Sequence, residues 1–322
     1  MKDTDFLRFK PPWVIQSGYL QTVCGSQFSG QTELPPRKTH KIQIDAENTL
    51  ILLEIPPAEP RQPVVVLSHG MGGCSESGYI RRIASKLHQK GVGVFMLNQR
   101  GSGAGMGLAS SLWNGSSSQD FGRMVKYIVS QYPQTSILLV GFSLGGNVLL
   151  KYLGEGQKIP RQVSGALAIN PPVDLKVSSR ILSKDLRLFN WYFMKLIRQQ
   201  AEAVVECFPD ATHPPLDAKT IWEFDAAYTA KTAGYRDAEE YYARASSGQF
   251  LAHIEVPTTV LCSRDDPFIP FTGFAQTPMS LAVNFYAPEK GGHMGYISKQ
   301  PTAYGDRRWM DAVVLDWVRN VF

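Results

Sequence analysis

The chain has 322 residues, of which 43% are hydrophobic and 19% are charged, and its formal net charge is +5. This composition is that of an ordinary globular protein, long enough to bury a substantial core. The positive charge is mild and forms no dense run of lysine and arginine, which argues against a nucleic-acid partner.

Several kinds of segment are missing from the sequence. Residues 1 to 6 contain no apolar stretch that would predict a signal peptide. No run approaches the roughly 18 apolar residues that a membrane span needs. The cysteines lie far apart and fit no zinc-binding spacing; they are Cys24, Cys74, Cys207 and Cys262. We therefore expect a cytoplasmic protein without a transmembrane segment, a metal or a cofactor.

The first 38 residues are irregular, with proline pairs at 11–12 and 35–36, but they carry several apolar side chains. Those side chains are Trp13, Val14, Ile15, Tyr19 and Leu20. They predict an N-terminal arm, residues 1–38, that packs on the rest of the chain. Residues 41–55 follow as a hairpin of two short strands, at 42–44 and 50–53.

From residue 63 onward, short apolar runs alternate with segments of helical spacing. The runs that predict buried strands lie at 64–67, 92–97, 136–140, 163–169, 258–262 and 283–286. The segments that predict helices lie at 79–89, 118–132, 144–153 and 309–318. Strands that are apolar throughout and separated by helices predict an α/β fold, with a mostly parallel sheet covered by helices on both faces.

Between residues 173 and 250 the alternation stops, and the chain becomes helical in pattern and rich in aromatic residues. One interpretation is a helical excursion that fills its own small core. The segment also follows the end of a strand, and sites in α/β proteins lie outside the carboxyl ends of the strands. We therefore expect a core of residues 39–172 and 251–322, with residues 173–250 as a helical lid insertion.

A serine stands where the strand at 136–140 meets the helix at 144–153, with almost no loop between them. Gly141 and Gly145 flank Ser143, since a turn this sharp brings the two backbones too close for other side chains. The spacing G-x-S-x-G arises by chance in about one chain in ten of this length, so the flanking strand and helix carry the interpretation. Together they predict a nucleophile elbow.

A serine nucleophile needs a base, and the base needs an acid that orients it. In this fold the acid and then a histidine follow the nucleophile along the chain. Asp265 and Asp266 come directly after a predicted strand, and His293 lies in a glycine-rich loop beyond the next one. We favour Asp266, because it stands four residues before Pro270, the frame of the acid in many such hydrolases. Asp265 remains the alternative.

The other histidines fit this chain order less well. His40 precedes the nucleophile, His88 lies late in a surface helix, and neither His213 nor His253 follows a strand. His40 also stands five residues before Asp45, a pattern claimed for some acyltransferases. We interpret that pattern as chance, because residues five apart in a strand point to opposite faces.

The tetrahedral intermediate needs preorganised N–H donors for its oxyanion. We expect one backbone donor from Leu144, the residue after the nucleophile, and the other from Met71 in the loop His69-Gly-Met-Gly-Gly73. His69 itself is interpreted as a structural residue, hydrogen-bonded within the loop. The paired glycines suggest phosphate binding as an alternative, but no Walker lysine or Rossmann spacing follows.

Five motifs together resemble the YheT-like branch of the α/β-hydrolase superfamily, over nearly the whole chain. They are His69-Gly-Met-Gly-Gly73, Asn98-Gln-Arg-Gly101, Gly141-Phe-Ser-Leu-Gly-Gly-Asn147, Asp265-Asp-Pro-Phe268 and Gly291-Gly-His-Met-Gly295. Residues 222–229 with 241–247, and 11–13 with 20–22, resemble that branch specifically. The resemblance implies a serine hydrolase that acts on carboxylic esters, lipid-like ones included, without a cofactor.

The sequence therefore predicts a metal-free ester hydrolase with a small-molecule or lipid-like ester as its substrate. Ser143 would attack, His293 would act as base and then as acid, and Asp266 would orient His293. The aromatic residues of the insertion favour an apolar acyl or alcohol group. An acyltransferase or thioesterase would use the same residues. A non-catalytic binding protein of this fold is less favoured, because such a protein need not keep a serine, an acid and a histidine in this order along the chain.

Overall fold

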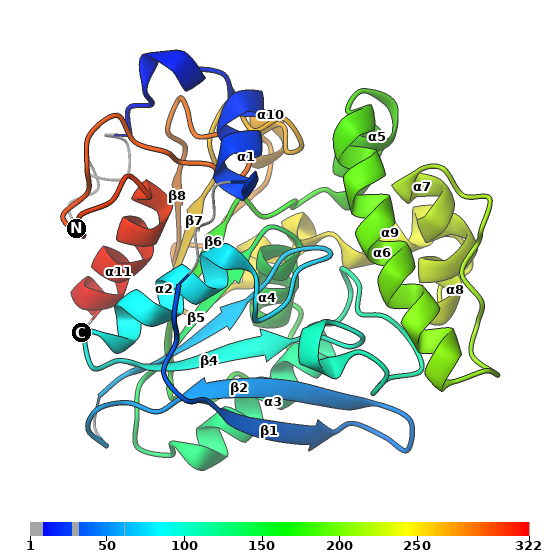
Figure 1. Cartoon of the computed structure of the whole chain (residues 1–322), viewed down its shortest axis with the longest axis horizontal. Helices are drawn as coiled ribbons and strands as arrows, with labels where there is room; N and C mark the ends of the chain where they lie inside the picture. Colours follow the sequence, from blue (N-terminus) through cyan, green and yellow to red (C-terminus); the bar gives the residue numbers. More distant parts are fainter. Residues whose placement is uncertain (1–8, 28–31, 61, 322) are drawn as a thin grey trace.

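The computed structural model describes residues 9–27, 32–60 and 62–321 (Figure 1). Its strands are β1 (Lys38–Gln43), β2 (Thr49–Ile55), β3 (Val64–Ser68), β4 (Gly93–Asn98), β5 (Ile137–Phe142), β6 (Val163–Ile169), β7 (Thr258–Leu261) and β8 (Val283–Tyr286). They form one sheet in the order β1-β2-β4-β3-β5-β6-β7-β8. β2 pairs antiparallel with β1 and β4, and every other pairing is parallel.

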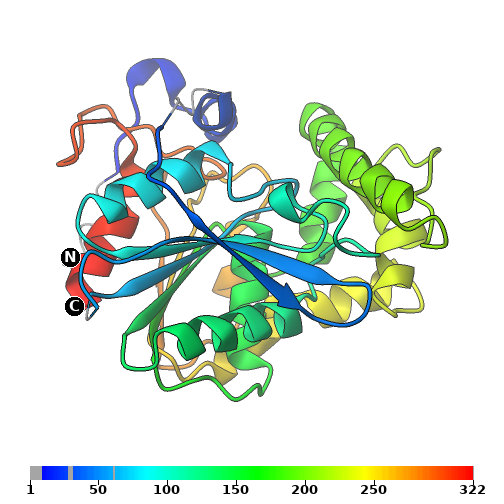
Figure 2. The same cartoon turned by 60° about the horizontal axis from the view of Figure 1, so that its bottom comes forward.

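Helices cover both faces of this sheet. α2 (Gly78–His88) and α11 (Trp309–Val321) contact each other on one face, while α3 (Ser118–Gln131) and α4 (Leu144–Gly154) pack on the other. Figure 2 shows α2 above the sheet and α3 below it. Each face has its own apolar cluster, and β3 contributes Val64 and Val66 to one and Val65 and Leu67 to the other. This two-residue alternation confirms the predicted sheet with both faces covered.

The largest difference from the predicted strands is at β1, which begins at Lys38 although the sequence predicted a strand only from residue 42. Its buried position is polar: His40 Nε2 lies 2.6 Å from Glu54 Oε2, and His40 Nδ1 lies 2.9 Å from the Tyr127 hydroxyl. Because the buried side chain of β1 is a histidine paired with Glu54 and Tyr127, its sequence lacks the alternation of apolar and polar residues that predicts a strand. These contacts also make His40 a structural residue, remote from any nucleophile.

The N-terminal arm packs on the body, but only in part through the side chains that suggested it. Trp13, Val14 and Leu20 are exposed, Trp13 by 83%. The Tyr19 ring is partly exposed but packs edge-on against Phe189, with the ring centroids 5.0 Å apart. Residues 1–8 and 28–31 of the predicted arm lie outside the described residues. The arm contains the short turn η2 (Trp13–Ile15) and the helix α1 (Gly18–Gln27).

The packing face of α1 consists of glycine and polar residues. A Cβ on Gly18 would lie 1.8 Å from the carbonyl oxygen of Asp265, so only glycine permits this approach. The buried Gln21 side chain accepts from the backbone N–H of Ile297 at 2.8 Å and donates to its carbonyl at 3.2 Å. Helix α1 is therefore joined to the chain at Asp265 by close backbone approach and to the chain at Ile297 by hydrogen bonds. A search of the sequence for apolar patterns does not reveal contacts of either kind.

The insertion after β6 is helical, as the sequence predicted. Figure 1 shows its helices grouped to one side of the sheet. They are α5 (Leu175–Lys184), α6 (Arg187–Cys207), α7 (Ile221–Phe224), the π-helical turn η4 (Asp225–Thr229), α8 (Ala230–Thr232), α9 (Ala238–Ala245) and the 3₁₀ helix η5 (Ser247–His253). The insertion has a small core of its own around Tyr241 and Tyr242, whereas Phe189 and Met194 join the main cluster on one face of the sheet.

A buried ion-pair cluster joins α2 to α11 on the face of the sheet that these two helices cover. The Asp311 carboxylate is fully buried and accepts from Arg82 Nε at 3.0 Å and from Lys86 Nζ at 2.9 Å. Removing one partner of a buried ion pair leaves charge without compensation in a poorly solvated site.

We expect Asp311→Ala to lower the free energy of unfolding by about 3 kcal/mol, because two cations lose the buried anion that they share. Urea denaturation measures this loss. The matched control is Asp316→Ala in the same helix, where the carboxylate is partly exposed and the expected loss is about 1 kcal/mol or less. Equal losses in the two variants would contradict the assigned role of Asp311.

Candidate active site

Ser143 is the single residue between β5 and α4, as predicted. Its backbone has φ 50° and ψ −124°, a conformation that non-glycine residues rarely adopt and that is typical of functional sites. A Cβ on Gly145 would lie 2.3 Å from the His69 carbonyl oxygen, and a Cβ on Gly141 would lie 2.7 Å from that of Gly145. At Gly141 this is the predicted approach of strand to helix, whereas Gly145 is crowded by the end of β3, so both positions require glycine.

Ser143, His293 and Asp266 form one hydrogen-bonded chain. Ser143 Oγ lies 2.9 Å from His293 Nε2, and His293 Nδ1 lies 2.8 Å from Asp266 Oδ2. The imidazole and the carboxylate are both buried. The structure thus brings together the three residues that the sequence selected, in the order that a serine nucleophile, its base and an orienting acid require.

The Asp266 carboxylate is held at both oxygens. Oδ1 accepts from the backbone N–H groups of Phe268 at 2.8 Å and Ile269 at 3.1 Å. Oδ2 accepts from Asn170 Nδ2 at 2.6 Å in addition to its contact with His293. Donors on both oxygens leave the carboxylate one orientation, with Oδ2 toward the imidazole.

Asp265 points elsewhere. Its Oδ1 accepts from the backbone N–H of Gly292 at 2.9 Å, and its Oδ2 lies 3.8 Å from Lys290 Nζ. Asp265 therefore binds the loop that carries His293 and not the imidazole itself.

The loop that carries His293 is strained and is held from outside by the N-terminal arm. Met294 and Tyr296 have positive φ values of 58° and 41°. The buried Thr22 of α1 accepts from the backbone N–H of His293 at 2.8 Å and donates its hydroxyl proton to the Gly18 carbonyl at 2.7 Å. On the other side, the Phe268 ring packs against the imidazole, with the ring centroids 4.5 Å apart.

Sequence reasoning missed Thr22 and two asparagines. Asn170 is fully buried at the end of β6, has φ 46°, and donates to Asp266 and to the Gly292 carbonyl. Asn147 in α4 donates to the Ala245 carbonyl at 3.0 Å, which ties the elbow helix to the insertion. The signal for both asparagines was a polar side chain inside or directly after an apolar run. Thr22 carried no such signal.

The two expected oxyanion donors border the nucleophile. Met71 and Leu144 line the same pocket as Ser143. Leu144 is the first residue of α4, where backbone N–H groups have no intrahelical partner. Within the described ranges, no backbone hydrogen bond uses the N–H of Met71. Both N–H groups are therefore available to an oxygen beside Ser143.

His69 begins the loop that contains Met71. It is fully buried, with Nδ1 2.8 Å from the Gly70 carbonyl and Nε2 accepting from the backbone N–H of Gln99 at 3.4 Å. Burial lowers the pKa of His69 to about 4, so the imidazole is neutral at pH 7 and does not act as a charge near Ser143. It holds the loop in place, as predicted.

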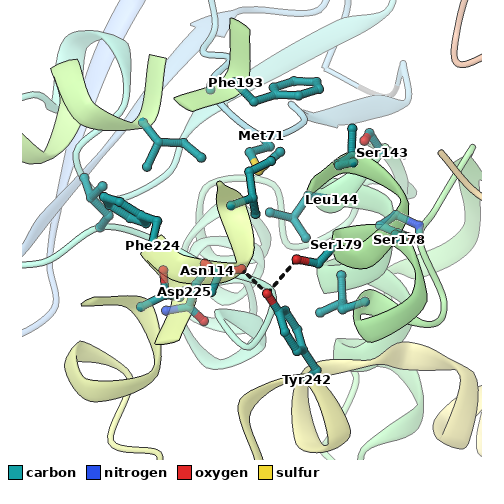
Figure 3. A pocket seen from close by; sticks show the side chains of 18 of the residues that line it. Met71, Asn114, Ser143, Leu144, Ser178, Ser179, Phe193, Phe224, Asp225 and Tyr242 are labelled. Atoms are coloured by element: carbon teal, nitrogen blue, oxygen red, sulfur yellow. Dashed lines mark hydrogen bonds between the residues drawn. The ribbon is translucent and has the colours of Figure 1, made fainter. Parts of the chain in front are cut away.

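Two pockets meet at Ser143 and His293, and both also include Met71, Phe193 and Phe268. The inner pocket lies between the sheet and the insertion (Figure 3), and its apolar walls include Leu112, Leu175, Leu182, Ile197, Phe224 and Tyr228. The outer pocket lies between α1, α2 and the start of α6, and its walls include Val23, Tyr79, Leu188, Phe189 and Tyr192. A molecule reacting at Ser143 can therefore extend to either side.

The described part of the chain contains no group of three or more His, Cys, Asp or Glu side chains that could hold a metal ion. None of its helices combines the length and the apolar character that crossing a bilayer requires.

We expect Thr22→Val to lower kcat about tenfold with little change in KM, because losing one hydrogen bond to the His293 backbone misplaces the base. Thr22→Ser keeps the hydroxyl and should restore kcat. Rates on a small ester, together with urea unfolding of each variant, separate this effect from a loss of stability. The control Ser17→Ala removes an exposed hydroxyl of the same arm that bonds only the Leu20 N–H. If Thr22→Ser is as slow as Thr22→Val, the hydroxyl is not what positions His293.

Comparison with known sequences places the chain in a family. Residues 63–300 match the sequence profile described as alpha/beta hydrolase fold. The YheT protein of Escherichia coli (strain K12) is 26% identical over 96% of this chain and 92% of its own length. The Mus musculus protein named Monoacylglycerol lipase ABHD2 is 28% identical over 97% of this chain and 79% of its own length.

A third relative is the Saccharomyces cerevisiae protein named Medium-chain fatty acid ethyl ester synthase/esterase 2, which is 30% identical over 76% of this chain and 60% of its own length. Among solved structures, a soluble variant of monoglyceride lipase from Saccharomyces cerevisiae aligns with a TM-score of 0.59 over 91% of this chain and 98% of that one. Their 15% identity makes this a likeness of fold alone. The family profile, the sheet topology and the elbow agree: the chain belongs to the α/β-hydrolase fold family.

Proposed function

We propose that this protein is a serine hydrolase that cleaves carboxylic esters, in particular apolar or lipid-like acyl esters, through an acyl-enzyme. The observation that carries the proposal is the hydrogen-bonded chain Ser143–His293–Asp266, which opens on a pocket with apolar walls. The names of the relatives, which include an esterase and a lipase, support the same class of reaction.

In this proposal His293 Nε2 takes the Ser143 proton as Oγ attacks the ester carbonyl, and the N–H groups of Met71 and Leu144 receive the oxyanion. His293 then gives that proton to the departing alcohol oxygen, which leaves an acyl-Ser143 ester. Water, activated by the same imidazole, attacks the acyl group and releases the acid. Asp266 accepts from Nδ1–H throughout and stabilises the imidazolium that forms twice.

The insertion acts as a lid in this proposal. Its residues line the inner pocket together with Ser143, among them Leu175, Leu182, Phe193, Ile197 and Phe224. Burying an alkyl chain against such walls contributes about 0.8 kcal/mol for each CH₂ group. The inner pocket therefore favours an ester with an extended acyl or alcohol group.

Acyl transfer is a second candidate function, and a specific observation favours it. The yeast relative at 30% identity is named both a synthase and an esterase of ethyl esters. An acyl-Ser143 ester partitions between water and a competing alcohol or thiol, so the same residues serve both reactions. Measuring hydrolysis and transfer products from one ester in the presence of added alcohols separates the two.

Replacing the nucleophile tests the proposal. We expect Ser143→Ala to keep the fold and to lower kcat by about 10⁴-fold or more, to the level that the oxyanion donors and binding alone support. Labelling by a fluorophosphonate probe and turnover of esters of increasing chain length measure the effect. Ser130→Ala, an exposed serine of α3, is the control. Undiminished labelling or turnover in Ser143→Ala would refute the mechanism.

The two aspartates give a sharper test of the acid. Asp266→Asn should lower kcat by about 10⁴-fold, because an amide at this position disturbs the tautomer and removes the charge beside the imidazolium. Asp265→Asn keeps an acceptor for the Gly292 N–H, so its kcat should fall by less than about tenfold. The comparison requires folded variants at matched pH. The reverse ranking would move the acid to Asp265.

A further inference from the structure

One part of the inner pocket wall is polar. Tyr242 of α9 places its hydroxyl 2.7 Å from Asp225 Oδ2 of η4 and 2.7 Å from Ser179 Oγ of α5. Figure 3 shows Ser143 toward the top of the pocket and this group toward the bottom, with Leu144 between them. Three separate elements of the insertion therefore contribute polar groups to one point of a mostly apolar pocket.

The aspartate belongs to an irregular turn. η4 is a π-helical turn between α7 and α8, inside a helical stretch that runs from Ile221 to Thr232. Such turns are rare and often occur at functional sites, because they redirect side chains that a regular helix would place elsewhere. Here the turn carries both Asp225 and Tyr228, and both line the inner pocket.

The Asp225 carboxylate has hydroxyl neighbours but no cation partner in the described part of the chain. Burial raises its pKa to about 6, against hydrogen bonds from Thr229 and Tyr242. The tyrosines of α9 that face it are neutral, since burial also raises their pKa values. Two cations of α5, Lys176 and Arg180, pair with the exposed Glu239 instead. A half-buried carboxylate without a cation can accept further hydrogen bonds from a ligand.

A second observation points to a ligand independently. The Tyr228 side chain is only 1% exposed, and its hydroxyl has no hydrogen-bond partner among the described residues. Buried polar groups are nearly always hydrogen-bonded, so this hydroxyl requires an explanation. A polar group of a bound molecule in the same pocket would supply the missing partner.

We propose that Asp225, Tyr228, Ser179 and Tyr242 form a distal subsite that binds a hydrogen-bond donor, a hydroxyl or a protonated amine, on the part of the substrate that fills the inner pocket. The inference rests on the proposed ester hydrolysis and narrows its substrate class. The preferred ester is apolar near the reacting carbonyl and carries a donor at its far end. A chain of the same length that ends in a methyl group would displace water from the Asp225 carboxylate. It would offer no donor in place of the hydrogen bonds that the water made.

The ionisation of Asp225 distinguishes the two kinds of donor. The carboxylate is neutral well below pH 6 and charged well above it, given its raised pKa. An ammonium group gains more from the charged form than a hydroxyl does. Preference for an amine-terminated ester over a hydroxyl-terminated one should therefore increase as the pH rises through about 6.

The test uses p-nitrophenyl esters of alkanoic acids in a series of chain lengths, each ending in a methyl, hydroxyl or ammonium group. A second series carries the same end groups on the alcohol of alkyl acetates. At one chain length in one series, the wild-type protein should prefer a donor-terminated ester over the methyl-terminated one by about tenfold or more in kcat/KM. Asp225→Ala should abolish that preference, and Asp225→Asn, which is nearly isosteric, should abolish it for the ammonium ester. The control Glu239→Gln alters an exposed carboxylate of α9 and should leave the preference for donor-terminated esters unchanged.

The outcomes separate this inference from the proposed function. If methyl-terminated esters are preferred at every length, or if Asp225→Ala leaves the ratio unchanged, the subsite is overturned while ester hydrolysis stands. If no ester shows Ser143-dependent turnover, ester hydrolysis fails. The subsite is then tested by calorimetric binding of methyl-, hydroxyl- and ammonium-terminated alkanamides to Ser143→Ala. Equal affinities for the three end groups overturn the subsite, and tighter binding of a donor-terminated amide that Asp225→Ala removes supports it.

Discussion

The position of one imidazole is the constraint on which the rest of the site depends. His293 must reach Ser143 Oγ with one ring nitrogen and Asp266 Oδ2 with the other, at 2.9 and 2.8 Å. The three side chains follow β5, β7 and β8, and parallel pairing brings the ends of these strands to the same edge of the sheet. The sheet thus brings the three residues near one another, and the loops that carry them set the exact hydrogen-bonding distances.

A layer of buried polar groups provides that finer placement. A carboxylate in a poorly solvated site is costly unless donors satisfy it, and Asp266 has donors from Asn170, from its own turn and from His293. The strained loop around His293 is held in turn by Thr22, which comes from the N-terminal arm. The arm is therefore part of the support of the site, and its close contact requires glycine at position 18.

The insertion supplies one side of the pocket beside Ser143. Its helices bury some apolar side chains in a core of their own and present others to the pocket beside Ser143. Asn147 joins the elbow helix to the end of the insertion, since its side chain donates to the Ala245 carbonyl and accepts from the backbone N–H of Ser247. The expectation of an apolar substrate matches most of these walls, and the polar group around Asp225 is the part of the pocket that aromatic content alone could not indicate.

The sequence by itself determined the features that have a local signature. Apolar periodicity is sufficient for the sheet and its covering helices, and the strand–serine–helix pattern with its two glycines is sufficient for the elbow. The order of residues along the chain narrowed the partners of Ser143 to His293 and two adjacent aspartates, and the proline at position 270 favoured Asp266. Only the tertiary structure placed Asp266 against His293 and turned Asp265 toward Gly292, because neighbouring residues differ in direction and not in pattern. It alone brought Thr22 to His293 across 271 residues of chain, since a single hydrogen bond between distant segments leaves no periodic trace in the sequence.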